Sequence, residues 1–185
     1  PDLDVSISSE VAPEIREYER FSTTVCNAYV QPLMASYLGK IKAGLEGKDI
    51  KSPFLLITSG GGLTTLETAS KFPIRLVESG PAGGAILASK VSSQIGSNAS
   101  LSFDMGGTTA KLCLIDSSEP RISRQFEVDR SYRFKKGSGL PLKIPVIEML
   151  EIGAGGGSIA HVDKMDRIKV GPESAGSSPG PACYD

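Results

Sequence analysis

FDMGGTTAK, residues 103–111, is the stretch that decides the fold of this chain. Apolar and polar residues alternate along residues 101–105, which is typical of a strand with one buried face. Gly106 and Gly107 then turn the chain, and a second alternating run leads back to residue 116. The spacing therefore predicts a β-hairpin over residues 101–116.

The turn of this hairpin combines groups that suit an anion. Successive backbone N–H groups and paired hydroxyls in one turn favour phosphate binding. A carboxylate beside phosphate requires a cation between them, so Asp104 is a candidate catalytic residue that would hold Mg²⁺ through water. A plain hairpin whose glycines serve only the turn explains the same pattern, and both interpretations stay open. The candidate ligand-binding residues are Gly106, Gly107, Thr108, Thr109 and Lys111.

A second glycine cluster, GAGGGS, occupies residues 153–158. It lacks the spacing of a Walker loop, and it departs from GxGxxG because Ser158 stands at the third glycine position. By itself the motif is therefore a weak indication of nucleotide binding. The alternative is a tight loop between two strands.

Residues 50–95 alternate strand, glycine turn and helix, which predicts an α/β layer with a largely parallel sheet. The glycine turns at 59–62 and 78–84 suit either an anion or close packing. The predicted strands are residues 54–58 and 74–77, and the predicted helices pass through residues 66–69 and 86–91.

Residues 1–48 predict helices. Pro13 suits the first turn of a helix over residues 13–20, and a second helix, kinked at Pro32, should end at Gly44 or Gly47. Apolar residues at helical spacing predict its core-facing stripe. These are Val30, Leu33, Met34, Tyr37, Leu38, Ile41 and Leu45.

Residues 100–185 read as β-rich after the polar connector 92–100. Besides the hairpin, we expect strands over residues 123–128, 143–152 and 158–162. The chain thus predicts one α/β unit with three regions: a helical segment (1–48), a strand–helix region (50–95) and a β-rich region (100–185).

Composition excludes several classes of function. The chain has 39% hydrophobic and 22% charged residues and a net charge of −1, which gives no electrostatic basis for binding nucleic acid or a membrane. Cys26, Cys113 and Cys183 lack metal or disulfide spacing, so we expect reduced thiols in a cytoplasmic protein. His161 is the only histidine and is expected at the surface. The absence of an initiator Met and the Gly/Pro-rich end suggest a piece of a longer protein.

Five segments together resemble the hydantoinase A and 5-oxoprolinase family, which includes an acetone carboxylase subunit on the same scaffold. They are ISSEVAPEIREYERFSTTVCNAYVQP (7–32), ESGPAGGA (78–85), FDMGGTTAK (103–111), YRFKKGSGLPLKIPVIEMLEIGAGGGSIA (132–160) and VGPESAGSSPGPACY (170–184). The resemblance implies an actin, Hsp70 and sugar-kinase-like (ribonuclease H-like) ATPase fold, with a mixed sheet and flanking helices. Asp104 and residues 106–109 match that family's DxGGT phosphate hairpin. The resemblance also implies that Gly155, Gly156 and Gly157 belong to a further glycine loop on the nucleotide side. Members of that family have a second phosphate hairpin in another lobe. This second hairpin is missing from the sequence, so the chain alone should not catalyse ATP turnover.

The resemblance also implies a reaction. ATP, with Mg²⁺ and a K⁺-like ion, would phosphorylate the carbonyl oxygen of a five-membered cyclic amide or imide such as hydantoin, N-methylhydantoin or 5-oxoproline, and water would open the ring. A B-type hydantoinase subunit is the implied protein partner. Two alternatives stay open: an acetone-carboxylase-type subunit, and a nucleotide-binding or assembly module without its own catalysis.

Overall fold

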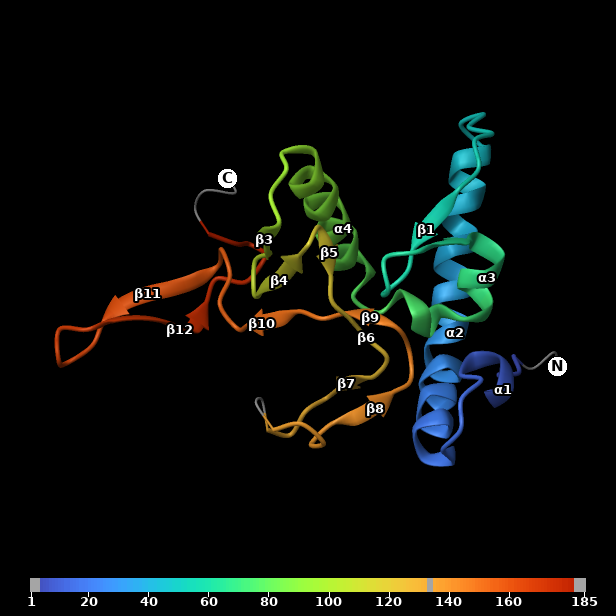
Figure 1. Ribbon diagram of the computed structural model, residues 1–185, viewed down its shortest axis with the longest axis horizontal. Helices are drawn as coiled ribbons and strands as arrows, with labels where there is room; N and C mark the ends of the chain where they lie inside the picture. Colours follow the sequence, from blue (N-terminus) through green and yellow to red (C-terminus); the bar gives the residue numbers. More distant parts are fainter. Residues whose placement is uncertain (1–3, 133–134, 182–185) are drawn as a thin grey trace. The chain divides into compact units, whose positions relative to one another are not determined.

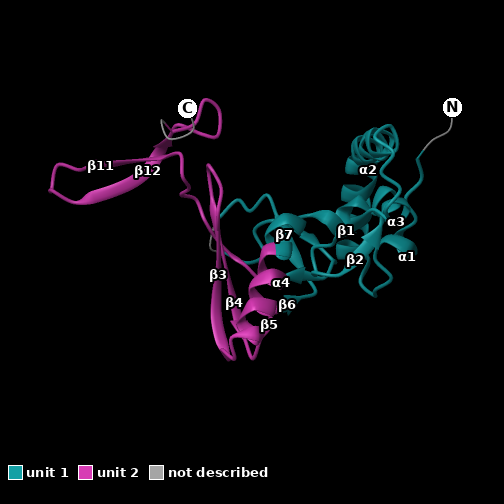
Figure 2. Cartoon of the chain, turned by 90° about the horizontal axis from the view of Figure 1, so that it is seen from above, with its two compact units in different colours: residues 1–83, 122–147 teal, residues 84–121, 148–185 magenta. Residues whose placement is uncertain are grey.

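The computed structural model of the chain describes residues 4–132 and 135–181, so Cys183 lies outside the described residues. The chain forms two compact units and crosses between them three times (Figure 2). Unit 1 holds residues 1–83 and 122–147, and unit 2 holds residues 84–121 and 148–185.

Unit 1 begins with helices and continues with short paired strands (Figure 1). Its elements are α1 (Ser8–Val11), α2 (Glu17–Glu46), β1 (Leu55–Ile57), β2 (Leu63–Thr65), α3 (Leu66–Lys71), the 3₁₀ helix η1 (Pro73–Leu76), β6 (Ile122–Ser123), β7 (Phe126–Val128), β8 (Leu140–Leu142) and β9 (Val146–Ile147). The predicted strands over 123–128 and 143–152 are therefore each divided into two shorter strands.

The helix predicted over residues 13–20 and the second helix after it are one continuous helix, α2, which starts later than predicted. Arg16 has a φ of 82°, which is incompatible with a right-handed helix, so the predicted helix over 13–20 is wrong in its first turn. Glu17 and Glu19 then lie in the first turn of α2, where the helix dipole favours acidic groups. The predicted end is confirmed at Gly47, whose N–H donates to the carbonyl oxygen of Ala43 at 2.9 Å.

The predicted parallel sheet over residues 50–95 is wrong. β1 and β2 form an antiparallel hairpin around the 59–62 glycine turn, with Leu55 opposite Thr65. Residues 74–77 were expected to form a strand but belong mainly to η1, because Pro73 fixes φ and lacks an N–H for a strand ladder. Every strand pair among the described residues is antiparallel, so the α/β class comes from mixed helices and small sheets.

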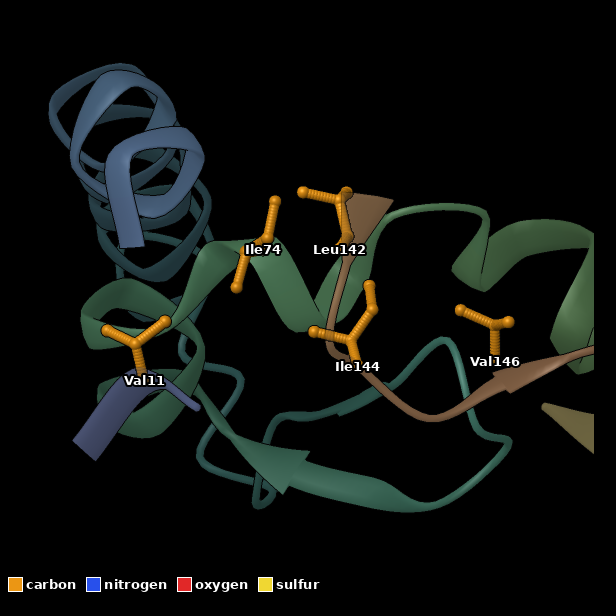
Figure 3. Packing of buried hydrophobic residues seen from close by; sticks show 5 residues of the cluster. All are labelled: Val11, Ile74, Leu142, Ile144 and Val146. Carbon is orange, nitrogen blue, oxygen red and sulfur yellow. The ribbon is translucent and has the colours of Figure 1, made fainter. Parts of the chain in front are cut away.

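The core of unit 1 joins segments that are distant in sequence (Figure 3). Its buried members are Val11, Ile74, Leu142, Ile144 and Val146. The prediction that the apolar stripe of α2 faces the core is wrong in part. Leu38 is buried, but Leu33 is 75% exposed and Tyr37 is 55% exposed. The helix instead buries a polar stripe, whose hydrogen bonds decide its orientation.

Unit 2 carries most of the α4 helix and the hairpin. Its elements are α4 (Ser79–Gln94), β3 (Ala99–Met105), β4 (Ala110–Asp116), β5 (Glu119–Pro120), β10 (Leu150–Ile152), β11 (Ser158–Val162) and β12 (Ile168–Ser174), and the unit boundary at Gly83 and Gly84 lies inside α4. The loop expected over residues 78–84 is helical from Ser79, because Pro81 fits the first turn of a helix.

The predicted hairpin over residues 101–116 is confirmed as β3 and β4. Its sheet has the order β10–β4–β3, and β5 also pairs with β4. One face is covered: Cys113 and Ile115 are buried, and Ser92 of α4 bonds to Ser100 of β3 at 2.6 Å. The opposite face carries large apolar side chains that are exposed, among them Leu114. The hairpin is therefore held by α4 from one side only.

Candidate functional site

The candidate site is the tip of the β3–β4 hairpin in unit 2. Met105 and Ala110 are the last pair in register, and the N–H of Gly106 closes the turn by donating to the carbonyl oxygen of Thr109 at 2.9 Å. Gly107 and Thr108 project beyond this closing bond. The sequence and the ladder together thus fix a turn of four residues, 106–109.

This turn presents a group of hydrogen-bond donors. Within residues 4–132 and 135–181, no acceptor meets the N–H groups of Gly107, Thr108 or Thr109, and none meets the two threonine hydroxyls. Thr108 is exposed, and Gly107 and Thr109 are half-buried. Backbone donors at the mouth of a turn bind anions because they carry partial positive charge without a counter-ion. The turn has the donor set that a phosphate group requires.

The glycine loop at 153–158 lies directly against this turn. The N–H of Gly156 donates to the carbonyl oxygen of Gly106 at 2.9 Å, and the N–H of Gly157 donates to that of Gly107 at 2.8 Å. The N–H of Gly155 bonds to the hydroxyl of Ser158 at 2.9 Å. All three N–H groups are used inside the chain, so the loop holds the carbonyl side of the turn.

The glycines are required by the closeness of the two backbones. A Cβ on Gly155 would lie 2.5 Å from the carbonyl oxygen of Gly106 and 2.8 Å from the amide nitrogen of Thr108. A Cβ on Gly157 would lie 2.9 Å from the carbonyl oxygen of Gly107. Contacts this short are not tolerated against backbone atoms, so no side chain fits at either position.

A third segment, residues 174–178, completes the cluster, and the sequence did not predict a place for it at this site. The N–H of Ala175 donates to the carbonyl oxygen of Gly157 at 2.7 Å, and a Cβ on Gly107 would lie 3.2 Å from the Cβ of Ser177. Its signals in the sequence were the family resemblance over residues 170–184 and a Gly/Pro-rich composition. Three segments separated by up to about seventy residues therefore meet behind one turn.

Asp104 and Lys111 lie beside the turn, opposite each other in the β3–β4 register. Asp104 is exposed and bonds to no other described residue. The Nζ of Lys111 lies 3.6 Å from Oε1 of Glu151, which faces it from β10. One carboxylate and one amine thus stand on the same strand pair, two residues outside the donor turn.

The other glycine turns have packing roles. Ser59 is buried, and its N–H and hydroxyl both donate to the carbonyl oxygen of Arg75, at 2.8 and 2.7 Å. A Cβ on Gly60 would lie 3.2 Å from the Cβ of Pro145, and one on Gly83 would lie 3.0 Å from Cδ1 of Ile57. These glycines allow close packing within unit 1.

The remaining sequence candidates stand apart from the cluster. His161 is exposed on β11 opposite Lys169, as predicted for a surface histidine. Burial raises the pKa of the Cys113 thiol, and the charge of Glu148 raises it further. Burial also raises the pKa of the Cys26 thiol. Neither thiol is activated for nucleophilic attack, since the thiolate is the reactive form.

Among residues 4–132 and 135–181, no three His, Cys, Asp or Glu side chains gather into a group able to hold a metal ion. No helix of the described chain is long and apolar enough to cross a membrane.

Comparison with known proteins places this geometry in a family. The model of the hydantoinase/oxoprolinase family matches residues 20–185. An uncharacterized protein of Methanocaldococcus jannaschii is 43% identical over 98% of the chain and 27% of its own length. The caprolactamase subunit alpha of Pseudomonas jessenii is 37% identical over 100% of the chain and 25% of its own length. The 5-oxoprolinase of Saccharomyces cerevisiae is 35% identical over 97% of the chain and 13% of its own length.

Two solved structures share the fold. The ATP-dependent caprolactamase of Pseudomonas jessenii superposes on 100% of the chain and 25% of its own, with a TM-score of 0.69 and 34% identity. A nucleotide-free acetone carboxylase superposes on 91% of the chain and 22% of its own, with a TM-score of 0.71 and 29% identity. The α/β arrangement is thus of the actin-like ATPase type found in these enzymes. The chain spans about a quarter of several of these relatives, and it belongs to the hydantoinase/oxoprolinase family, which includes ATP-dependent enzymes.

Proposed function

We propose that the hairpin turn of unit 2 binds the phosphates of ATP in a subunit of an ATP-dependent cyclic amide hydrolase. The observation that carries this proposal is the set of N–H groups of Gly107, Thr108 and Thr109, which meet no acceptor among the described residues. The two threonine hydroxyls add side-chain donors to the same turn. ATP-dependent relatives support a nucleotide as the anion.

In this proposal Gly155, Gly156 and Gly157 act on the nucleotide through the turn. Their N–H groups bond inside the chain, to carbonyl oxygens of the turn and to Ser158, which leaves the outward donors of residues 107–109 for the ligand. A donor set that is already held in place loses little entropy on binding. The loop would thus preorganise the phosphate site.

Asp104 and Lys111 would help to neutralise the negative charge of the bound nucleotide. Asp104 is exposed and is the second-last residue of the strand that leads into the turn, so it suits a Mg²⁺ ion held through water, which prefers one or two carboxylates together with phosphate oxygens. Mg²⁺ would supply neutralisation of charge on the phosphates. Lys111 would add a positive charge on the returning strand, where Glu151 restrains its Nζ.

The reaction class is activation of an amide carbonyl. An amide is a poor electrophile, and transfer of a phosphoryl group from ATP to its oxygen creates a leaving group that water can displace as the ring opens. The closer relatives with printed amide substrates, caprolactamase and 5-oxoprolinase, support this class at 37% and 35% identity. Acetophenone and acetone carboxylase subunits, at 33% and 30%, support carboxylation as the second candidate.

The proposal includes a second protein chain. Caprolactamase subunit alpha, acetophenone carboxylase gamma subunit and acetone carboxylase beta subunit are each parts of assemblies. We infer that a B-type subunit accompanies this chain and that the remaining parts of the nucleotide site and the substrate pocket lie outside residues 1–185. The chain alone would therefore not catalyse the ATP-dependent reaction.

The test compares Asp104→Asn with Asp116→Asn in the full-length subunit with its partner. Both are exposed carboxylates on the same hairpin, but only Asp104 adjoins the turn. We expect Asp104→Asn to lower ATP-dependent turnover by about a hundredfold or more, and Asp116→Asn to leave it unchanged. The assay should offer hydantoin, 5-oxoproline, caprolactam and acetone, because product identity separates hydrolase from carboxylase. Equal activity of the two variants would show that Asp104 is not part of the site.

A further inference from the structure

Residues 175–178 continue from strand β12 and lie against the hairpin turn of residues 106–109. β11 begins at the last residue of the glycine loop, and β12 ends at Ser174. The N–H of Ala175 donates to the carbonyl oxygen of Gly157 at 2.7 Å, which closes the base of the β11–β12 hairpin. The segment is therefore fixed against the same loop that supports the turn.

Backbone contacts, rather than its own side chain, set the position of Ser177. The preceding residue, Gly176, has a φ of 66°, a left-handed conformation that glycine adopts readily. The N–H of Gly176 donates to the hydroxyl of Ser174 at 3.0 Å, and its carbonyl oxygen would lie 3.4 Å from a Cβ on Gly107. Replacing the side chain of Ser177 should therefore leave the path of the segment unchanged.

Ser177 lies next to Gly107, whose N–H meets no acceptor among the described residues. A Cβ on Gly107 would lie 3.2 Å from the Cβ and 3.3 Å from the Cα of Ser177. The amide nitrogen and the Cβ of a residue share one Cα, so the Cβ of Ser177 lies within about 6 Å of the Gly107 nitrogen. Hydrogen bonds to oxygen span about 2.7–3.0 Å between heavy atoms. These lengths allow one phosphate group to accept from the N–H of Gly107 and from the hydroxyl of Ser177 together.

The hydroxyl of Ser177 has no partner inside the part of the chain that the structure describes. Ser177 is exposed, and no described residue bonds to its hydroxyl. Two other serines at the base of the β11–β12 hairpin differ in this respect. The hydroxyl of Ser158 accepts from the N–H of Gly155 at 2.9 Å. The hydroxyl of Ser174 accepts from the N–H of Gly176. Those two hydroxyls hold the fold, whereas that of Ser177 stays available to a ligand.

The surroundings of Ser177 suit an acceptor that carries negative charge. The neighbouring turn already offers the N–H groups and hydroxyls of residues 107–109, which meet no acceptor among the described residues. A lone exposed serine indicates no ligand, but a hydroxyl beside several unsatisfied donors extends an anion site. A hydrogen bond from a hydroxyl to an ionised oxygen is about twice as strong as one between neutral groups. A phosphate group therefore gains from this hydroxyl more than water does.

We propose that Ser177 supplies a further hydroxyl to the anion site of the turn and donates to the phosphate that the N–H of Gly107 binds. This inference rests on the proposed function, because it takes the turn as the phosphate site. Both ends of the β11–β12 hairpin then act on one ligand. The glycine loop before β11 positions the turn, and Ser177 after β12 contacts the phosphate itself.

The test is isothermal titration calorimetry of ATP and Mg²⁺ with the full-length subunit and its partner. Ser177→Ala should weaken ATP binding by about tenfold, as expected for one hydrogen bond to a charged group. Ser178→Ala is the matched control. This neighbouring serine is also exposed, but none of its atoms is among the three nearest to a Cβ on Gly107. The control should leave the affinity unchanged. Both variants should keep the melting temperature of the wild type, because neither hydroxyl bonds to a described residue.

Thr108→Val in the same assay separates this inference from the function on which it rests. Weaker ATP binding by Thr108→Val and by Ser177→Ala, at an unchanged melting temperature, supports the inference. If Thr108→Val weakens binding but Ser177→Ala binds as tightly as Ser178→Ala, the turn is the phosphate site and Ser177 is not part of it. If neither Thr108→Val nor Ser177→Ala weakens binding, the proposed function fails and the inference fails with it. An equal loss in Ser178→Ala, or a lower melting temperature of Ser177→Ala, would overturn the inference, because the segment would then act through the fold.

Discussion

The N–H of Gly156 donates to the carbonyl oxygen of Gly106 at 2.9 Å, which ties the glycine loop to a hairpin turn fifty residues earlier. This bond and its neighbour from Gly157 to Gly107 turn the carbonyl groups of the turn inward. The two glycine motifs therefore form one structural unit. The loop at residues 153–158 supports the turn, and the turn at residues 106–109 has N–H groups that are free to bind a ligand.

Gly155→Ala should destabilise unit 2 by about 1–3 kcal/mol, because its Cβ would collide with backbone atoms of Gly106 and Thr108. Gly84→Ala is the matched control. A Cβ at Gly84 meets no described atom within 4 Å, and its place inside α4 makes alanine favourable by up to about 1 kcal/mol. Urea unfolding of both variants measures the difference. Equal effects would show that the loop and the turn are not in close contact.

Thr108→Val should weaken ATP binding without changing the melting temperature. Valine keeps the β-branched shape, and the hydroxyl of Thr108 bonds to no described residue. The chain alone should bind ATP only weakly, with a dissociation constant of about 1 mM, because donors in a solvated half-site are worth little. A ligand-detected NMR titration of ATP suits this range. Thr64→Val in β2 serves as the control, and binding equal to the control's would assign Thr108 to the scaffold.

Asn27→Ala should lower the free energy of unfolding by about 2–4 kcal/mol, because it leaves the carbonyl oxygen of Lys71 and the N–H of Ile74 without their partner in a buried site. Ser36→Ala, at an exposed position of the same helix, should stay within about 0.5 kcal/mol of the wild type. Chemical denaturation of the two variants gives both values. A loss for Asn27→Ala no larger than that of Ser36→Ala would contradict the buried polar network.

The stability contributed by Cys113 should fall at alkaline pH. Burial raises the pKa of its thiol in the folded chain, so the contribution is complete below the pKa of the unfolded thiol and is lost as pH rises through the folded pKa. The difference in unfolding free energy between wild type and Cys113→Ala should therefore shrink above the ordinary thiol pKa. Its slope cannot exceed about 1.4 kcal/mol per pH unit, the limit for one proton. A difference that stays constant with pH would refute the shift.

The sequence by itself determined the local elements whose signals are short-range. The alternation along residues 101–105 and the two glycines that follow predicted the hairpin, and the second of two candidate glycines, Gly44 and Gly47, marks the end of α2. The continuous resemblance over most of the chain gave the family, which the family match confirms. Each of these depends on residues that are neighbours along the chain or on a long colinear pattern.

The tertiary structure decided what those elements do. Periodicity could not tell which side of α2 is buried, because hydrogen bonds from Asn27 to groups 21 and 44 residues away outweigh its apolar stripe. Nor could spacing tell which glycine motif offers donors. The N–H groups of Gly156 and Gly157 are consumed by the turn at Gly106 and Gly107, and a backbone group bonded in this way is not available to a ligand.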